Sequence, residues 1–246
     1  MEIVNQNKID DLIENGYEMK VSEYISGGIQ MVKDNLGLFV GFTIVTFIIS
    51  SMAGMIPFGS VAVGAPLGAG FIIAANKISK GYEIEFSDFF KGFDYFGQLV
   101  VSSILFILLF AALAIPTGIF IFSMVALDFE GPFALFPAVI FGFSILGAVL
   151  YFTVSFMWAP HLIVFGKKRA WESMEMSLKI IKKDFWNFAG FGIMLALMNF
   201  AGLLCFGFGL LFTIPASACA LYLAFEDVTE MSIENGGEYI ENHLVD

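Results

Sequence analysis

Six uninterrupted apolar stretches occupy most of this 246-residue chain, and each is long enough to suggest a helix that crosses a bilayer. The hydrocarbon core of a membrane is about 30 Å thick, so a spanning helix needs about 20 mostly apolar residues. The stretches are Leu36–Ile56, Phe58–Ile78, Gly97–Leu127, Pro132–Phe165, Phe185–Phe206 and Phe208–Phe225. We therefore expect an all-α integral membrane bundle of six transmembrane helices, of which the last is the shortest.

The composition agrees with a chain whose main solvent is lipid. Hydrophobic residues make up 58% of it and charged residues 14%, against about 45–50% and about 25% in soluble domains. A soluble protein of this length could not bury so large an apolar fraction. This excludes a secreted hydrolase and a soluble cofactor enzyme. The net charge of -11 also argues against a nucleic-acid partner, because such binding depends on clustered Lys and Arg.

The basic residues predict the orientation of the spans. All 12 Lys and Arg lie before the first stretch, between the end of the second, where Lys77 is, and the start of the third, or between the fourth and fifth. The segments on the opposite side contain no basic residue and only two acidic ones, Asp128 and Glu130. Cytoplasmic loops carry the excess of Lys and Arg in multi-pass proteins, so we expect both termini in the cytoplasm. The first span is expected to direct insertion, since no cleavable signal peptide is predicted.

Composition also divides the chain into three parts. They are an acidic cytoplasmic segment with an interfacial helix (residues 1–35), the six-helix membrane domain (residues 36–225) and an acidic cytoplasmic tail (residues 226–246). Met19–Asn35, Phe86–Phe96 and Trp171–Asp184 mix apolar and charged residues near helical spacing. We expect three cytoplasmic amphipathic helices here, lying in the headgroup layer with lysines toward anionic lipid. The alternative is an ordinary soluble helix that caps a loop.

The third of these segments shows the pattern most clearly. Its apolar stripe consists of Trp171, Met174, Leu178 and Ile181, and most of its charged residues lie off the stripe.

An internal repeat is a further prediction. The unit of an amphipathic helix followed by a membrane hairpin occurs three times, and the first and third copies align without gaps at an offset of 149 residues. In this alignment Pro66 falls on Pro215, each in the middle of the second helix of its hairpin. Both copies have the same orientation, as in parallel repeats about an axis along the membrane normal. The alternative is shared composition without common structure.

No catalytic residue, cofactor or metal site is predicted. An ionisable residue inside the hydrocarbon is a functional hypothesis because it is costly there, but every Asp, Glu, Lys and Arg maps to a loop, a tail or an interface. The two histidines are too few for a histidine metal centre. Cys205 and Cys219 lie in apolar stretches and are expected to be buried small hydrophobic residues.

Four positions remain as candidate helix-break or ligand-binding sites. Pro66 and Pro215 would free backbone carbonyls if they break their helices, although close packing is the commoner role of such positions. Asn199 lies in the middle of a span, where it would bind a ligand or form a hydrogen bond between helices. His161 follows Pro160 at the cytoplasmic end of the fourth span and would titrate near neutral pH, or would be an interfacial side chain without a functional role.

The region around residues 150–228 resembles a known family. Trp158–Ile163 (WAPHLI) leads into a basic turn, then Ala170–Leu178 (AWESMEMSL), a Lys-Asp-Phe-Trp junction and a Gly-rich hairpin with a mid-helix proline. This order resembles the six-helix bacterial inner-membrane proteins related to the membrane domain of glycerophosphodiester phosphodiesterases. The resemblance implies the fold and a bacterial inner-membrane location. It does not imply the enzyme activity, which belongs to a separate soluble barrel and its metal ligands.

The sequence thus favours a non-enzymatic integral membrane protein with a structural, assembly or regulatory role, acting through its helix faces and cytoplasmic helices. Its expected partners are membrane lipids and other membrane subunits or further copies of itself. The alternative is a small transporter or channel-forming subunit with an uncharged pathway, since backbone carbonyls at broken helices can coordinate ions.

Overall fold

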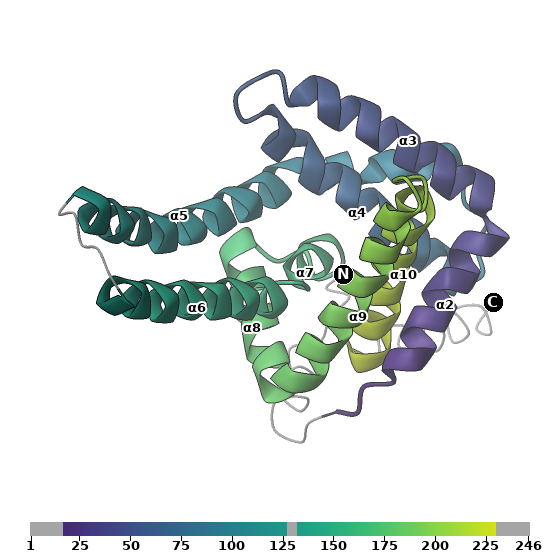
Figure 1. The fold of residues 1–246 in the computed structure, drawn as a ribbon. Helices are drawn as coiled ribbons and strands as arrows, with labels where there is room; N and C mark the ends of the chain where they lie inside the picture. The colour runs from purple at the N-terminus through teal and green to yellow at the C-terminus, as the bar shows by residue number, and fades with distance from the viewer. Residues whose placement is uncertain (1–16, 127–131, 230–246) are drawn as a thin grey trace.

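Six helices of the protein are long and apolar enough to cross a membrane. The computed structural model describes residues 17–126 and 132–229 (Figure 1). The six helices are α3 (Leu36–Ala53), α4 (Gly59–Ser79), α5 (Phe96–Ala126), α6 (Pro132–Ser155), α9 (Phe185–Leu204) and α10 (Leu210–Thr229). The predicted all-α fold with six apolar helices is therefore confirmed for the described residues. Asp128 and Glu130 lie outside them, as do residues 1–16 and 230–246 of the two predicted acidic segments.

Two predicted spans end elsewhere than expected. The fourth stretch does not form one helix, because α6 ends at Ser155 and a short helix, α7, covers Ala159–Val164. The last helix, α10, was expected to end at Phe225 and to be the shortest, but it continues to Thr229 and is longer than α3. The reason is that Glu226 is only 6% exposed and packs within the bundle.

Each of the three segments predicted to be amphipathic is also helical. α2 covers Val21–Asp34, the 3₁₀ helix η1 covers Phe86–Tyr95, and α8 covers Ala170–Lys183. In α8 the Glu172 carboxylate lies in the first turn and two lysines lie in the last. These charges oppose the helix dipole at both ends, which stabilises the helix.

The face that α8 buries differs in part from the predicted stripe. Of that stripe, Met174 and Ile181 are buried inside the protein, whereas Trp171 is 65% exposed. The remainder of the buried face is formed by Ile180 and by three small side chains, Ala170, Ser173 and Ser177. Small residues allow α8 to approach its neighbours closely, whereas the bulky indole of Trp171 remains on the outside.

The bundle is closed by a cyclic pattern of contacts between its helices. α2 precedes the α3–α4 pair in the sequence but packs along α10, η1 precedes α5–α6 but packs along α4, and α8 precedes α9–α10 but packs against α7. Figure 1 shows α4, α7 and α10 near the middle of the molecule, with α2 beside α10. Each helix pair is thus fastened by the short helix that precedes another pair.

Glycines permit two of these contacts. A Cβ atom on Gly92 of η1 would overlap the carbonyl oxygen of Pro66 in α4, and one on Gly28 of α2 would lie 2.6 Å from the carbonyl oxygen of Ala216 in α10. Real Cβ atoms do not come so close to backbone oxygens. Therefore η1 can approach α4, and α2 can approach α10, at these distances only because glycine has no side chain.

Aromatic side chains fill the interior where the short helices join the spans. Phe42 of α3 stacks on Phe89 of η1 with ring centroids 4.5 Å apart, and Trp158 meets Phe188 of α9 edge-on at 4.7 Å. All four rings are fully buried. Such aromatic pairs contribute about 0.5–1.5 kcal/mol each beyond the burial of their area.

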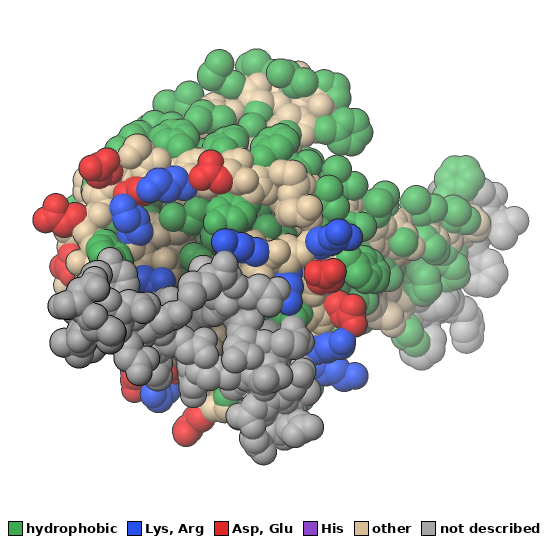
Figure 2. Space-filling view, turned by 180° about the vertical axis from the view of Figure 1, so that it is seen from behind, with side chains coloured by type: hydrophobic (Ala, Val, Ile, Leu, Met, Phe, Trp, Pro, Cys, Tyr) green, Lys and Arg blue, Asp and Glu red, His purple; other side chains and the backbone are tan. Residues whose placement is uncertain are grey.

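The α5–α6 pair projects away from this packed region (Figure 1). No residue in the most apolar window of α5 is buried inside the protein. Charged side chains gather over one part of the surface in Figure 2, whereas the projecting helices are covered by apolar ones. We call the region of α2, η1 and α8 the charged end of the bundle.

Candidate functional site

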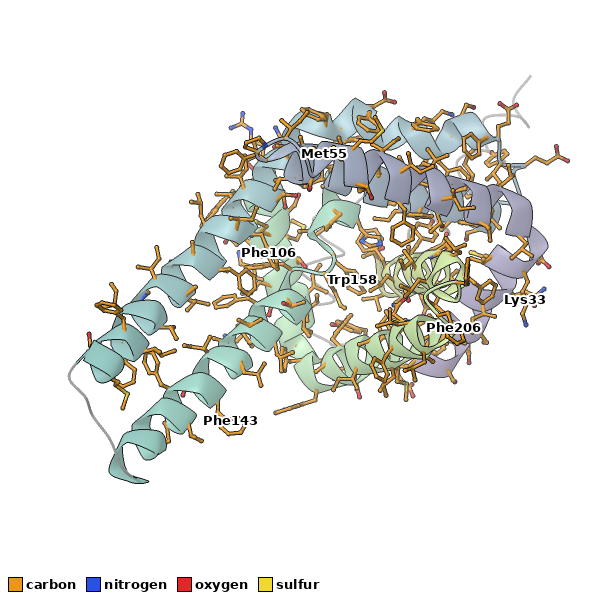
Figure 3. The ribbon with its side chains drawn as sticks, turned by 45° about the horizontal axis from the view of Figure 1, so that its top comes forward. Lys33, Met55, Phe106, Phe143, Trp158 and Phe206 are labelled. Carbon is orange, nitrogen blue, oxygen red and sulfur yellow. The ribbon has the colours of Figure 1, made fainter. Side chains whose placement is uncertain are left out.

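A cavity of about 1050 Å³ lies between the helix pairs and is the candidate functional site. Its walls include Ser60 and Ala65 of α4, Ser103 and Phe106 of α5, Leu150 and Tyr151 of α6, Pro160 of α7, Ala189, Ala196 and Asn199 of α9, and Ser217 of α10. Figure 3 shows Phe106 on the projecting α5, and its ring lies 6.2 Å from that of Phe156 at the end of α6. No Asp, Glu, Lys, Arg or His is among the described residues that line the cavity.

The break between α6 and α7 is part of the cavity wall, and a hydroxyl from α8 stabilises it. The Oγ of Ser177 donates to the carbonyl of Ser155 at 2.7 Å and accepts the backbone N–H of Trp158 at 3.3 Å. All three residues are buried. An unpaired backbone group is costly in such surroundings, so one serine side chain satisfies groups on both sides of the interruption.

This arrangement predicts that Ser177→Ala weakens the bundle. Removal of the hydroxyl leaves a buried N–H and a buried carbonyl without that partner, which should cost about 1–3 kcal/mol of unfolding free energy. Thermal unfolding in detergent provides the measurement. Ser144→Ala is the matched control, because Ser144 is exposed and its hydroxyl bonds only within α6; equal losses in both variants would contradict this role for Ser177.

Of the four predicted site residues, Asn199 alone lines the cavity. Its Nδ2 donates to the carbonyl of Leu195 at 2.9 Å and to the Oγ of Ser217 at 2.8 Å. The second bond joins α9 to α10, which is the interhelical hydrogen bond that the sequence offered as one alternative for this residue.

The other three predicted residues lie elsewhere. His161 is 2% exposed and its ring packs 5.1 Å from that of Phe225, so it is a buried side chain of α7 and not an interfacial one. Pro66 and Pro215 are buried in the middle of α4 and α10, and both helices continue through them without interruption. The structure does not place either proline in the cavity wall, although their neighbours Ala65 and Ser217 are part of it.

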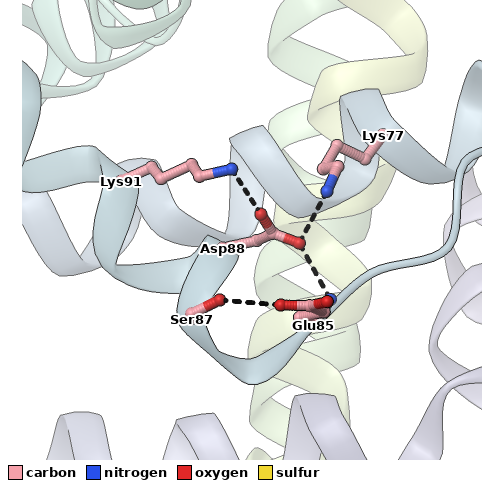
Figure 4. Close-up of polar contacts among 5 residues, drawn as sticks. All are labelled: Lys77, Glu85, Ser87, Asp88 and Lys91. Carbon is pink, nitrogen blue, oxygen red and sulfur yellow. Dashed lines mark hydrogen bonds and ion pairs between the residues drawn. The ribbon is translucent and has the colours of Figure 1, made fainter.

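A group of ionic contacts at the charged end was not predicted. The Asp88 side chain of η1 is 3% exposed and lies between two lysines, 2.8 Å from Lys77 Nζ and 2.6 Å from Lys91 Nζ (Figure 4). It also accepts the backbone N–H of Glu85 at 2.8 Å. Lys77 belongs to α4, so Asp88 fastens η1 to that span. The only local signal in the sequence is the three-residue spacing of Asp88 and Lys91, because a loop separates Lys77 from both.

A second polar group joins α10 to α4 and α2. The Tyr222 hydroxyl donates to Glu226 at 3.0 Å and accepts from Asn76 of α4 at 2.6 Å. Ser79 also donates to Glu226. At the next residue of α10, Asp227 accepts the hydroxyl of Tyr24 of α2 at 2.6 Å. Burial, together with this bond to a carboxylate, raises the pKa of Tyr24 above its ordinary value, so its hydroxyl stays a donor at neutral pH.

The two cysteines differ from each other. Cys219 is buried in α10 as expected, but Cys205 is exposed where α9 ends, which makes the prediction wrong for Cys205. Within the described residues, no group of three or more His, Cys, Asp or Glu is arranged to hold a metal ion.

These features define a multi-pass membrane protein with an uncharged cavity among its apolar helices. No protein-family model, curated protein or solved structure matches the chain.

Proposed function

We propose that the chain is a non-enzymatic protein of the bacterial inner membrane that acts as a structural, assembly or regulatory component. It would act through the lipid-facing sides of its spans and through α2, η1 and α8 at the membrane surface. The observation that carries this proposal is that acidic side chains near the charged end connect helices to one another. Three acidic side chains, Asp88, Glu226 and Asp227, each form a bond that fastens one helix to another.

The proposed orientation places the charged end in the cytoplasm. The described basic residues belong to α2, η1, α8, the adjoining loops and the last turn of α4, and cytoplasmic segments are the ones enriched in Lys and Arg. The residues between α9 and α10, including Cys205, would then lie on the opposite side.

The exposed tryptophans support placement of α8 at the membrane surface. Trp171 of α8 is 65% exposed and Trp186 at the start of α9 is 83% exposed. Tryptophan is enriched where a membrane meets water, because its ring is apolar and its N–H is polar. Trp158, which is fully buried, offers an internal reference.

We therefore expect Trp171 to contact lipid near the headgroups. The contribution of Trp171 to the fluorescence is the difference between the wild type and Trp171→Phe. In nanodiscs, this component should be quenched by lipids brominated near the glycerol end of the chain. The Trp158 component should be insensitive to them. Quenching of the Trp171 component by aqueous iodide alone would instead make α8 an ordinary soluble helix.

The proposed internal repeat gains support from the packing. α2 and α8 begin and end 149 residues apart, which is the offset that superposes Pro66 on Pro215. At that offset Gly28 corresponds to Ser177, and each is the small residue through which its helix touches a span of another pair. We also keep the likeness to the phosphodiesterase membrane-domain proteins as part of the proposal, for fold and location only.

Transport is the second candidate, and the uncharged cavity is the observation that favours it. A transporter without membrane carboxylates would need exposed backbone carbonyls at broken helices. However, α4 and α10 are continuous at Pro66 and Pro215, and at the break between α6 and α7 the Ser155 carbonyl accepts the Ser177 hydroxyl.

Two measurements separate the candidates. For a structural component, we expect defined partners to co-purify from mild detergent, and vesicles with the purified protein to show no ion or solute flux. Flux through the wild-type protein that is lost in Pro66→Ala or Pro215→Ala, with thermal stability retained, would establish the transporter instead.

A further inference from the structure

The cavity reaches the surface of the bundle between α6 and α9. Leu150 of α6 and Trp186 and Ile193 of α9 line it, yet each is more than half exposed. The two helices are bridged near this place by the rings of Tyr151 and Phe185, 5.2 Å apart. A molecule in the bilayer therefore has a lateral way into the cavity, at the depth of the spans.

The chemistry of the walls selects an apolar chain. Apart from hydroxyls and the Asn199 amide, the walls are aliphatic and aromatic. Asn199 Nδ2 is already engaged with Leu195 and Ser217, which leaves Oδ1 as the amide atom without a hydrogen-bond partner. A water molecule is stable in a buried site only with two to four polar partners, and apolar cavities instead accept apolar molecules. Inside a bilayer, the apolar molecule available to enter the cavity is the acyl chain of a lipid.

Positive charge lies beside the mouth of the cavity. The last turn of α8 carries Lys182 and Lys183, and the chain then enters the cavity wall at Phe185 and Trp186. Lys182 is exposed. The neighbouring Asp184 carboxylate is bound by the amide of Asn187 at 2.9 Å. Lysines next to an interfacial tryptophan are the usual surroundings of an anionic lipid headgroup.

We propose that the cavity is a binding site for an anionic phospholipid, with an acyl chain between α6 and α9 and the headgroup beside the last turn of α8. The proposal rests on the proposed function only in placing these helices in a bilayer. It is independent of whether the protein transports a solute, because a bound lipid and a flux are measured separately.

The test uses two adjacent residues of α9. Both residues are exposed, but Ala196 lines the cavity and Leu197 does not. Ala196→Trp would fill the space with an indole, and Leu197→Trp adds the same side chain on the lipid-facing surface. Ala189→Phe, at a second wall position, provides a further variant should Ala196→Trp fail to fold, as judged by thermal unfolding.

Full-length protein is exchanged from nanodiscs of phosphatidylglycerol and phosphatidylcholine into mild detergent, and the retained lipid is measured by mass spectrometry. We expect the wild type and Leu197→Trp to retain lipid enriched in phosphatidylglycerol, and folded Ala196→Trp or Ala189→Phe to lose it. Lys182→Gln should retain lipid but lose the preference for phosphatidylglycerol.

Two results would overturn the proposal: equal lipid retention in the cavity-filling variants and the wild type, or no lipid retained by the wild type. An unchanged preference for phosphatidylglycerol in Lys182→Gln would overturn the headgroup site.

Discussion

Gly92→Ala is expected to lower the stability of the protein strongly although it adds only one methyl group. The new Cβ would overlap the carbonyl oxygen of Pro66, a backbone atom that cannot rotate away. Adding a methyl group to a well-packed interior costs about 1–3 kcal/mol, and more where the neighbours cannot yield. We expect the upper end of this range or beyond, measured by thermal unfolding of the purified protein, since η1 must move away from α4 as a unit.

Gly97→Ala is the matched control. Gly97 lies five residues further on, in the first turn of α5, and an added Cβ would meet no atom within 4 Å. Alanine also favours a helix over glycine by about 1 kcal/mol. This variant should therefore be neutral or slightly more stable. If both variants behave alike, the close contact between η1 and Pro66 is not a determinant of the fold.

Asp88→Ala is the second change with a large expected effect. The carboxylate is buried against two lysines and a backbone N–H (Figure 4). Hydrogen bonds to charged groups contribute about 1.5–3 kcal/mol each, but Lys77 and Lys91 are partly exposed and regain water when released. A loss of about 3 kcal/mol of unfolding free energy is therefore expected, near the lower end for a broken buried ion pair.

An exposed ion pair of the same chemistry provides the comparison. Glu175 and Lys179 lie 2.7 Å apart on α8, but both side chains are more than half exposed. Glu175→Gln should cost only about 0.3–0.5 kcal/mol, as is usual for surface pairs one helical turn apart. A loss for Asp88→Ala as small as this would show that η1 is held to α4 by its aromatic side chains alone.

The spans could be predicted because lipid imposes one requirement on every residue of a spanning helix. A continuous apolar run such as Leu36–Ile56 therefore identifies a helix without knowledge of its neighbours. The break after Ser155 could not be seen in this way, because the run stays apolar across it. It depends on Ser177, more than twenty residues away, which supplies the missing hydrogen bonds. Likewise, Glu226 was assigned to a solvated tail because its partners Ser79 and Tyr222 are brought together only by packing.

The candidate site was less predictable than the spans. Asn199 was identified because an amide in the middle of an apolar run is unusual, and its bond to Ser217 explains it. The cavity itself is lined by residues of α4, α5, α6, α9 and α10, which are far apart in the sequence. Their meeting depends on the packing of distant elements and leaves no local pattern in the sequence.

Labelling of single cysteines tests the central claim, a membrane bundle whose charged end lies in the cytoplasm, most directly. Cys205 is exposed between α9 and α10, and Cys219 is buried, so the wild-type protein already carries one reporter on the opposite side. A membrane-impermeant maleimide should label wild-type protein at Cys205 in intact cells. In a Cys205→Ser background, Lys182→Cys should react only after the membrane is permeabilised. Labelling of Lys182→Cys in intact cells, or protection of Cys205 until the membrane is opened, would contradict the account.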